Sequence, residues 1–314
     1  MATMVKKGFI MKNIIAHYTN GNYNVSLFSD GTKIRYNSLD FFDAAFPESM
    51  DVCITHKCNA GCGMCYAGCG PFGEQNDILT PKWLESVHPY TEMAIGGGNI
   101  FEHPQLEDFL KLMKNKKVIS NITVNQSHFK EHFSTIKRYV DEGLVKAVGV
   151  SVFSFDEELK QMLKILPHVV IHLIVGIVDK NLLDNLANNN LKIILLGYKT
   201  TGRGRTYSNT HENSILENMN FLKENIMSYR NKFEVISFDN LALEQLEIRR
   251  FFSDREWFIR FMGDDGVGGK MTSASMYIDM PTNSFAINSM EEERFEMMNS
   301  VDDAFKFLKE KYND

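Results

Sequence analysis

Short apolar runs alternate with amphipathic segments over most of the chain, beginning near residue 50. The apolar runs predict strands at 51–55, 92–95, 118–125, 146–152, 169–175, 191–197 and 233–238. The intervening segments predict helices at 104–115, 127–142, 157–165, 180–188 and 212–229. In the first of these, Leu106, Phe109, Leu110 and Met113 fall on one helical face. Repeated strand–helix units favour a parallel sheet with right-handed crossovers.

Six such units predict an α/β fold of a particular kind, a partial (β/α)6 TIM-like barrel. In barrels of this kind the functional site lies at the carboxyl ends of the strands. The polar and glycine-rich positions of this chain fall at those ends, namely the segment after residue 55, Gly96–Asn99, Asn125, Ser151 and Gly197–Arg205. The edge formed by these strand ends is therefore where we expect a site.

Three further segments lie before, within and after this pattern. Near the amino terminus, Ser29-Asp30-Gly31 separates two β-rich runs, 23–28 and 32–36, which predicts a hairpin. Thr80-Pro81 predicts a helix with Thr80 as its N-cap. The tail is expected to hold helices and one strand, 274–280. The expected parts are therefore an N-terminal β addition at 1–48, the barrel at 49–240 and a mixed C-terminal extension at 241–314 that caps the barrel.

Composition places limits on location and partners. The 314 residues are 44% hydrophobic and 24% charged, with a formal net charge of −6, so no global basic field indicates a nucleic-acid partner. The first residues lack the apolar run of a signal peptide. No uninterrupted apolar run of about 20 residues predicts a membrane span. We therefore expect a cytoplasmic protein whose thiols stay reduced.

All five cysteines lie between Cys53 and Cys69. Cys58, Cys62 and Cys65 have the spacing C-x3-C-x2-C, and closely spaced cysteines on one loop are typical ligands of iron–sulfur clusters. A zinc site remains an alternative, because the three thiols with one of Cys53, Cys69 or His56 make a tetrahedral set. The odd number of cysteines argues against a disulfide framework.

The loop Cys58-Asn-Ala-Gly-Cys62-Gly-Met-Cys65-Tyr66 resembles the signature of the radical S-adenosylmethionine superfamily, C-x3-C-x-Φ-C, in which Φ is commonly aromatic. Here Φ is Met64, and the aromatic Tyr66 comes one residue late. The resemblance covers about residues 50–240. It implies a [4Fe–4S] cluster held by Cys58, Cys62 and Cys65, with one iron open to S-adenosylmethionine.

The second predicted strand leads into Gly97-Gly98-Asn99-Ile100-Phe101-Glu102-His103-Pro104. This stretch is similar to the Gly-Gly-Glu-Pro motif of the same superfamily, where backbone groups receive the amino group of S-adenosylmethionine. Asn99 replaces the usual Glu, and Ile100 replaces Pro. Asn99 keeps a side-chain carbonyl acceptor but carries no charge. The resemblance implies that Gly97, Gly98 and Asn99 bind the cofactor.

Five more residues are candidates for cofactor contacts on the same resemblance. Asn125 and Ser151 end two strands, although strand ends are commonly polar in any case. Ile174 is placed for an apolar contact with adenine, which core packing explains equally well. Lys199 and Arg203 lie in a loop with three glycines, where cations suit a carboxylate or phosphate; a solvated basic loop is the alternative. A glycine-rich stretch, Asp264–Lys270, is a weaker candidate for the substrate entrance.

The resemblance implies a reaction in which reductive cleavage of S-adenosylmethionine gives a 5′-deoxyadenosyl radical that abstracts hydrogen from a substrate. A reductant such as flavodoxin or ferredoxin is implied. The substrate is expected to be a small anionic metabolite or nucleotide, or a peptide side chain. Two alternatives remain: an RNA-modifying enzyme using a patch of Lys199, Arg203 and Arg205, and a non-catalytic zinc or iron–sulfur protein. The sequence assigns no role to Cys53 or Cys69.

Overall fold

The computed structural model describes residues 2–5, 13–39, 41–261 and 273–313. Its main element is an 11-stranded sheet in the order β1-β11-β10-β9-β8-β7-β6-β5-β12-β13-β14, and a second sheet has the order β2-β3-β4. The strands from β5 to β11, together with β12, run parallel to one another. Antiparallel pairing occurs at the two ends, where β1 joins β11 and β13 joins β12. The fold is therefore mixed α/β with a largely parallel sheet, as the alternating pattern predicts.

The bounds of the strands follow the apolar runs closely. They are β1 Ala2–Val5, β2 Ile14–Asn20, β3 Tyr23–Phe28, β4 Lys33–Tyr36, β5 Ser49–Thr55, β6 Glu92–Gly97, β7 Ile119–Asn125, β8 Ala147–Ser151, β9 Val169–Ile174, β10 Lys192–Leu196, β11 Val235–Phe238, β12 Ser275–Asp279, β13 Ser284–Ala286 and β14 Phe295–Glu296. The predicted hairpin of β3 and β4 is confirmed, and β2 adds a third strand to it. All the strands predicted between residues 51 and 280 are present.

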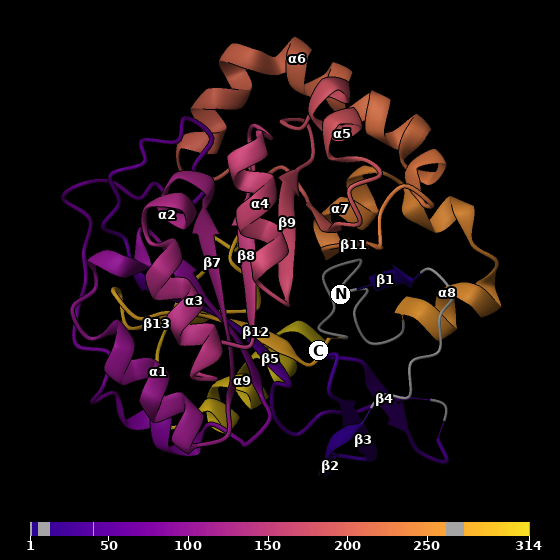
Figure 1. Ribbon diagram of the computed structural model, residues 1–314. Coiled ribbons are helices and arrows are strands. Elements are labelled where there is room, and N and C mark those ends of the chain that lie inside the picture. Colours follow the sequence, from indigo (N-terminus) through magenta and orange to yellow (C-terminus); the bar gives the residue numbers. More distant parts are fainter. Residues whose placement is uncertain (1, 6–12, 40, 262–272, 314) are drawn as a thin grey trace.

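The helices between residues 106 and 225 connect consecutive parallel strands. The α-helices are α1 Leu106–Asn115, α2 Gln126–Glu131, α3 Phe133–Asp141, α4 Glu157–Ile165, α5 Lys180–Leu186, α6 Arg203–Asn225, α7 Asn240–Gln245, α8 Asp254–Phe261 and α9 Val301–Asn313. Short 3-10 helices are η1 Lys82–Ser86, η2 Ile100–Glu102, η3 Ile226–Tyr229 and η4 Ile248–Phe251. Helices α1 to α4 lie on one side of the sheet (Figure 1). The predicted apolar face of α1 is buried, as expected.

Three helix predictions differ from the structure. The helix expected to begin at Thr80-Pro81 is only the 3-10 turn η1, in which Pro81 is the residue before the first turn and the Thr80 hydroxyl bonds Asp77 instead. The single helix expected at 127–142 is broken at His132, whose φ of −105° and ψ of 20° leave the helical region. Helix α6 begins at Arg203, nine residues before its predicted start at 212, so Arg203 lies on a helix and not in a loop.

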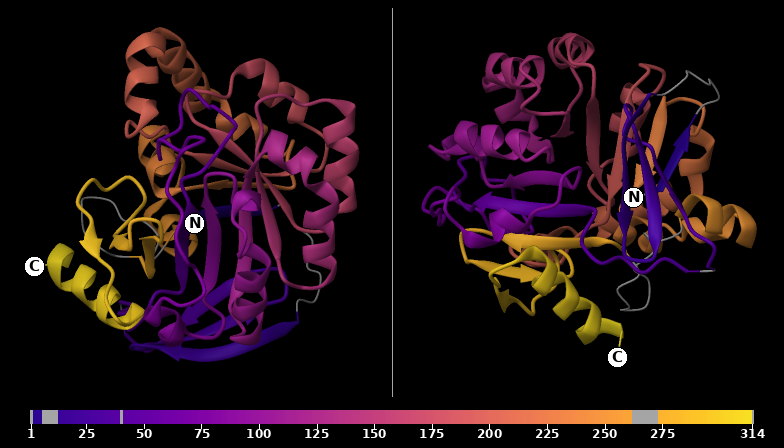
Figure 2. Two further views of the ribbon diagram at one scale, coloured as in Figure 1. Left: turned by 90° about the vertical axis from the view of Figure 1, so that its left-hand side faces the viewer. Right: turned by 90° about the horizontal axis from the view of Figure 1, so that it is seen from below.

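The C-terminal elements gather at the end of the sheet beyond β5, which Figure 2 shows from two further sides. Strand β12 pairs with β5 in parallel, so that Asp279 lies opposite Cys53 and Tyr277 opposite Asp51. The strand of the tail is thus part of the main sheet. The division of the chain at residues 48 and 240 remains a prediction.

Side chains of the parallel strands alternate between two faces, as the period of a strand requires. One set, which includes Val52, Ile95 and Val150, is buried in the core. The opposite set is more polar and includes Asp51, Asn121 and His172. The register carries this set across the sheet, since Asn125 pairs with Ser151 and Ser151 with His172. The polar face and the carboxyl ends of the strands are where the candidate site lies.

Candidate functional site

The cysteine loop follows β5 directly and folds back on itself through backbone hydrogen bonds. The amide of Cys58 donates to the carbonyl of Gly70 at 2.9 Å, and the amide of Gly70 donates to the carbonyl of His56 at 3.0 Å. Cys58, Cys62 and Cys65 are partly exposed, whereas Cys53 and Cys69 are buried, and all five are free thiols. The three thiols at signature spacing are therefore the accessible ones.

Arg203 connects the start of α6 to this loop through hydrogen bonds. Its Nε donates to the carbonyl of Cys62 at 3.0 Å, and its Nη1 donates to the carbonyl of Cys69 at 2.8 Å. Its own backbone amide donates to the carbonyl of Cys65 at 3.0 Å. Gly202, with φ of +51°, permits this approach because a Cβ there would lie 2.4 Å from the carbonyl oxygen of Tyr66. The structure thus shows Arg203 holding the cysteine loop.

Two of the loop thiols, Cys62 and Cys65, have hydrogen-bonding groups beside them. Nδ2 of Asn125 lies 3.4 Å from Sγ of Cys62, while Oδ1 of Asn125 accepts from the amide of Ser127 and caps α2. Interaction with the Cys69 thiol lowers the pKa of Cys65, and the backbone amides of Cys69 and Ala67 and the charge of Arg203 act in the same direction. The same interaction, with burial, raises the pKa of Cys69. The pair therefore favours negative charge on Cys65 rather than on Cys69.

Cys62 lies in a different environment. Burial raises the pKa of its thiol, and the neighbouring thiols of Cys65 and Cys58 raise it further. These effects disfavour the thiolate in the metal-free protein, whereas a bound cation would stabilise it. The loop therefore offers three sulfur donors. Asn125, at the end of β7, contacts one sulfur, and Arg203, at the start of α6, bonds the carbonyls of the loop.

The glycine-rich end of β6 packs against the same loop. The amide of Gly98 donates to the carbonyl of Thr55 at 2.6 Å, and the amide of Asn99 donates to the carbonyl of Lys57 at 2.8 Å. A Cβ on Gly98 would lie 2.1 Å from the Lys57 oxygen, and one on Gly97, whose φ is +111°, would lie 2.5 Å from the Thr55 oxygen. Close packing against residues 55–57 therefore requires both glycines. The side chain of Asn99 is buried and accepts from the amide of Phe101, which caps η2.

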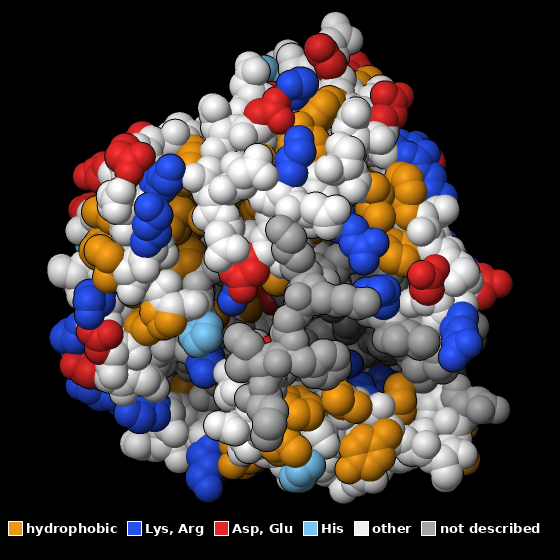
Figure 3. Space-filling view, turned by 45° about the vertical axis from the view of Figure 1, so that its right-hand side comes forward, with side chains coloured by type: hydrophobic (Ala, Val, Ile, Leu, Met, Phe, Trp, Pro, Cys, Tyr) orange, Lys and Arg blue, Asp and Glu red, His pale blue; other side chains and the backbone are white. Residues whose placement is uncertain are grey.

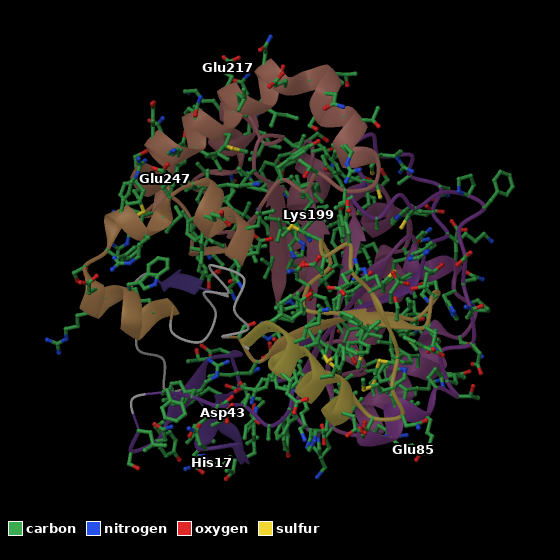
Figure 4. All side chains as sticks on the ribbon, turned by 180° about the vertical axis from the view of Figure 1, so that it is seen from behind. His17, Asp43, Glu85, Lys199, Glu217 and Glu247 are labelled. Carbon is green, nitrogen blue, oxygen red and sulfur yellow. The ribbon has the colours of Figure 1, made fainter. Side chains whose placement is uncertain are left out.

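Lys199 points inward and not to solvent. In Figure 4 it lies toward the middle of the molecule, whereas Glu217 and Glu247 lie at the periphery. Its Nζ donates to Oγ of Ser289 at 2.8 Å and lies 4.1 Å from the centre of the Tyr66 ring. Burial lowers the pKa of Lys199, and the carboxylates of Asp239 and Asp51 oppose that effect. Lys199 thus joins the C-terminal segment to the residue that follows Cys65.

The remaining predicted residues lie on neighbouring strand ends. Ser151 stands between Asn125 and His172 in the register, and Ile174, half-buried, pairs with Leu196. The His172 ring covers Gly149, where a Cβ would lie 2.3 Å from its atoms. Burial lowers the pKa of His172 to about 4, and Lys199 contributes to the shift. His172 is therefore a neutral imidazole on the polar face, and its buried Nδ1 has no hydrogen-bond partner among the described residues.

A separate group of donor atoms lies at the ends of β5 and β12. One donor atom each from Cys53, His56 and Asp279 lies within 4.8 Å of the others, so this group could hold one metal ion; among the described residues no other three His, Cys, Asp or Glu side chains come together in this way. The three loop thiols are not gathered in this way. A tetrahedral zinc ion needs its ligands around one centre, while an iron–sulfur cluster bonds its cysteines to different irons. The loop thiols are thus not arranged as a ready zinc site, and the cluster remains a prediction.

The sequence alone did not identify Asp279 as a neighbour of His56, or His172 as a residue of the polar face. Asp279 approaches His56 across 223 positions of sequence, and only the pairing of β12 with β5 brings them together. The end of an apolar strand was the only local signal for Asp279. His172 is identifiable in sequence as a polar residue inside an apolar strand. The glycine-rich stretch Asp264–Lys270 lies outside the described residues.

The basic patch considered for RNA binding does not form among the described residues. Arg203 is turned onto the cysteine loop, Lys199 points inward, and Arg205 pairs with Glu292. Figure 3 shows Lys and Arg side chains interspersed with Asp and Glu on the face it presents. Among the described helices, none has both the length and the apolar character needed to cross a bilayer.

Comparisons with known proteins found likeness in structure alone. No protein-family model and no curated protein matches the sequence. A crystal structure of SuiB from Streptococcus suis bound to the precursor peptide SuiA is similar over 97% of this chain and 89% of the SuiB chain, with a TM-score of 0.60 and 12% identity. A structure of SuiB bound to S-adenosylmethionine is similar over 85% of this chain and 66% of that chain, with a TM-score of 0.51 and 12% identity. At this identity the likeness shows a shared fold.

Proposed function

We propose that this chain is a radical S-adenosylmethionine enzyme that acts on a peptide, built on a partial (β/α)6 barrel and working in the reducing cytoplasm. The observation that carries the proposal is the set of donors around the signature thiols. Asn125 contacts Cys62, and the Cys69 thiol with two backbone amides contacts Cys65. The surroundings of Cys65 favour its ionised form, and a bound cation would offset the burial that opposes ionisation of Cys62. Cys58, Cys62 and Cys65 would hold that cluster.

When bound, a reduced cluster and S-adenosylmethionine supply a 5′-deoxyadenosyl radical that removes a hydrogen atom from the substrate. The chain's own residues position and shield the reactants. Arg203 and the Gly98–Thr55 and Asn99–Lys57 hydrogen bonds fix the loop against α6 and β6. Gly97, Gly98 and Asn99 would lie beside the amino group of the cofactor, and Ser151 and Ile174 beside its nucleoside. A flavodoxin or ferredoxin would supply the electron.

A peptide is favoured over a small metabolite by the fold likeness. SuiB, in one of its structures, holds a precursor peptide, and the present chain matches most of that structure. The polar face of the sheet offers a substrate the neutral imidazole of His172, the carboxyl group of Asp51 and the amine of Lys199, and burial raises the pKa of Asp51 and lowers that of Lys199. This arrangement suits a peptide segment better than a polyanion.

The test is anaerobic reconstitution followed by reaction. The purified chain should take up about four irons and, with dithionite and S-adenosylmethionine, should release 5′-deoxyadenosine. Cys62→Ala should lose both the iron and the product, whereas Cys53→Ala should keep the iron. Stoichiometric zinc in the loop with no 5′-deoxyadenosine would show a non-catalytic metal protein instead. Once cleavage is established, candidate peptides encoded near the gene are tested for mass changes.

A further inference from the structure

Three donor atoms of different chemistry meet at one end of the sheet, apart from the signature thiols. Cys53 is in β5 and Asp279 ends β12, and the two are register partners in neighbouring parallel strands. His56 follows β5, and its Nε2 lies 3.0 Å from Oδ2 of Asp279. Cys53 and His56 are three positions apart, whereas Asp279 lies 223 positions beyond His56, so Asp279 reaches them through the topology of the sheet.

The separations are close to those around a single metal ion. Sulfur, nitrogen and oxygen ligands of a tetrahedral zinc ion are bonded at about 2.0 to 2.3 Å, which places them about 3.3 to 3.8 Å from one another. The donor atoms here lie within 4.8 Å of one another without an ion. A zinc ion would replace the thiol proton of Cys53 and the proton between His56 Nε2 and Asp279 Oδ2, and side-chain movements of about 1 Å would then complete the geometry.

Surrounding residues hold each donor in place. A Cβ on Gly97 would lie 2.6 Å from Sγ of Cys53, so this sulfur fills the space above a glycine. The hydroxyl of Tyr277 donates to Oδ2 of Asp279 at 3.0 Å. The backbone amide of His56 donates to the carbonyl of Glu74 at 2.8 Å. Such supporting contacts orient metal ligands in proteins.

The donor set also leaves room for a fourth ligand. Zinc sites with three protein ligands and an open position are the reactive kind, whereas structural sites are closed by four. Cys53 is 3% exposed and Asp279 8%. His56 and Asp279 border a hollow of about 330 Å³, whose wall also includes Tyr66, Tyr277, Ser289 and Arg294. Tyr66 belongs to the cysteine loop, so an ion here would lie beside the proposed radical centre.

We propose that Cys53, His56 and Asp279 bind one zinc ion whose fourth position opens into this hollow. The fourth ligand is water in the resting protein. The hollow is large enough to admit a carboxylate, thiolate or imidazole side chain in its place. The site does not depend on the proposed radical reaction, because none of its ligands is a signature cysteine.

The test removes the loop thiols and measures metal binding in the full chain. A variant with Cys58→Ser, Cys62→Ser and Cys65→Ser is freed of metal with a chelator and titrated with zinc and with cobalt(II). We expect about one ion per chain and, with cobalt, a thiolate-to-metal absorption band in the near ultraviolet. Adding Cys53→Ser should abolish the band. Adding Asp279→Asn or His56→Gln should weaken zinc affinity by about ten-fold or more. Adding Cys69→Ser, the matched control, should leave binding unchanged.

Two results would overturn the site. One is a folded triple variant, checked by circular dichroism, that binds no zinc; the other is zinc binding that survives Cys53→Ser. If the triple variant does not fold, the cluster-loaded wild-type chain is analysed for metals, and zinc well below one per chain overturns the proposal. Release of 5′-deoxyadenosine is measured separately, so that failure of the radical reaction and failure of the zinc site give different results.

Discussion

Nδ2 of Asn125 lies 3.4 Å from Sγ of Cys62, although the two residues belong to different strand–loop units. The same side chain caps α2 through its other atom, Oδ1. One amide therefore joins a helix start to a sulfur of the cysteine loop. Hydrogen bonds to sulfur ligands are among the factors that set the reduction potential of iron–sulfur clusters.

We expect Asn125→Ser to lower the reduction potential of a bound cluster with little loss of stability. Serine preserves an N-cap acceptor but has no amide to reach Cys62. Loss of a hydrogen bond to a sulfur ligand makes the reduced cluster, which carries one more negative charge, less favourable. A redox titration followed by electron paramagnetic resonance measures the shift. Ser127→Ala, which keeps the Asn125 amide, serves as the control. An unchanged potential in Asn125→Ser would show that the contact does not reach the cluster.

Arg203→Lys should loosen the cysteine loop. A lysine ammonium cannot reproduce the two separate donations to the carbonyls of Cys62 and Cys69. Because hydrogen bonds from a charged group contribute about 1.5 to 3 kcal/mol, we expect a loss of that size in the free energy of unfolding, with reduced iron uptake. Urea unfolding and iron analysis are the measurements. Arg205→Lys alters an exposed ion pair with Glu292 and one donation to the carbonyl of Thr200, and it should cost less than about 1 kcal/mol.

Gly97→Ala and Gly70→Ala form a matched pair around the same loop. At Gly97 the φ of +111° and the Thr55 oxygen at 2.5 Å both oppose a side chain, whereas at Gly70 no atom lies within 4 Å of the added Cβ. We expect Gly97→Ala to destabilise the protein by more than about 1 kcal/mol and to reduce iron uptake. Gly70→Ala should do neither. Thermal unfolding of the two variants side by side tests this, and equal melting temperatures would contradict the close packing of β6 on the loop.

We expect the buried ion pair of Glu48 to make a contribution to the free energy of unfolding that is lost in acid. Its side chain is 1% exposed and pairs with Arg35 at 3.0 Å. Burial alone would raise the pKa of Glu48, but Arg35, Lys33 and the hydroxyl of Tyr23 outweigh it and lower the pKa. Because the folded pKa lies below the unfolded value, the stabilisation is present above the unfolded pKa and is lost as the pH falls through the folded one.

Glu48→Gln should therefore destabilise the protein at neutral pH, by about 3 kcal/mol, and progressively less below pH 4.5, the ordinary value for Glu. Denaturant unfolding of wild type and variant from neutral to acid pH measures the difference. Glu92→Gln is the control, since Glu92 is 30% exposed and lies 3.6 Å from Lys33; its effect should stay below about 1 kcal/mol. A pH-independent difference for Glu48→Gln would assign its effect to packing.

The sequence predicts the repeating part of the structure well because periodicity is a local property. Helices 106–115 and 157–165 follow from their apolar spacing. The break at His132 has no marker such as Gly or Pro in the sequence, and the short η1 results from tertiary packing of Trp83 and Leu84. The signature thiols are also identifiable locally. The group of Cys53, His56 and Asp279 is not identifiable locally, because it depends on which strand pairs with β5.

The glycines at 97 and 98 show a different kind of limit. Their residue type indicates close approach of backbone to something, and the sequence suggests a ligand. In the structure they approach the carbonyls of Thr55 and Lys57. Residue type thus predicts a close backbone approach, and the packing identifies the carbonyls of residues 55 and 57 as groups approached; the cofactor contact at 97–99 stays a prediction.

The parallel pairing of β12 with β5 has a consequence for biosynthesis. Until residues 275–279 emerge, β5 is an edge strand with unpaired backbone groups beside the cysteine loop, and the 223 positions between His56 and Asp279 make that closure a late event. During translation the nascent chain would expose both the loop thiols and this edge. The proposed zinc site gains its third ligand, Asp279, only when β12 docks on β5, so a zinc ion bound there would report that the C-terminal strand is in place.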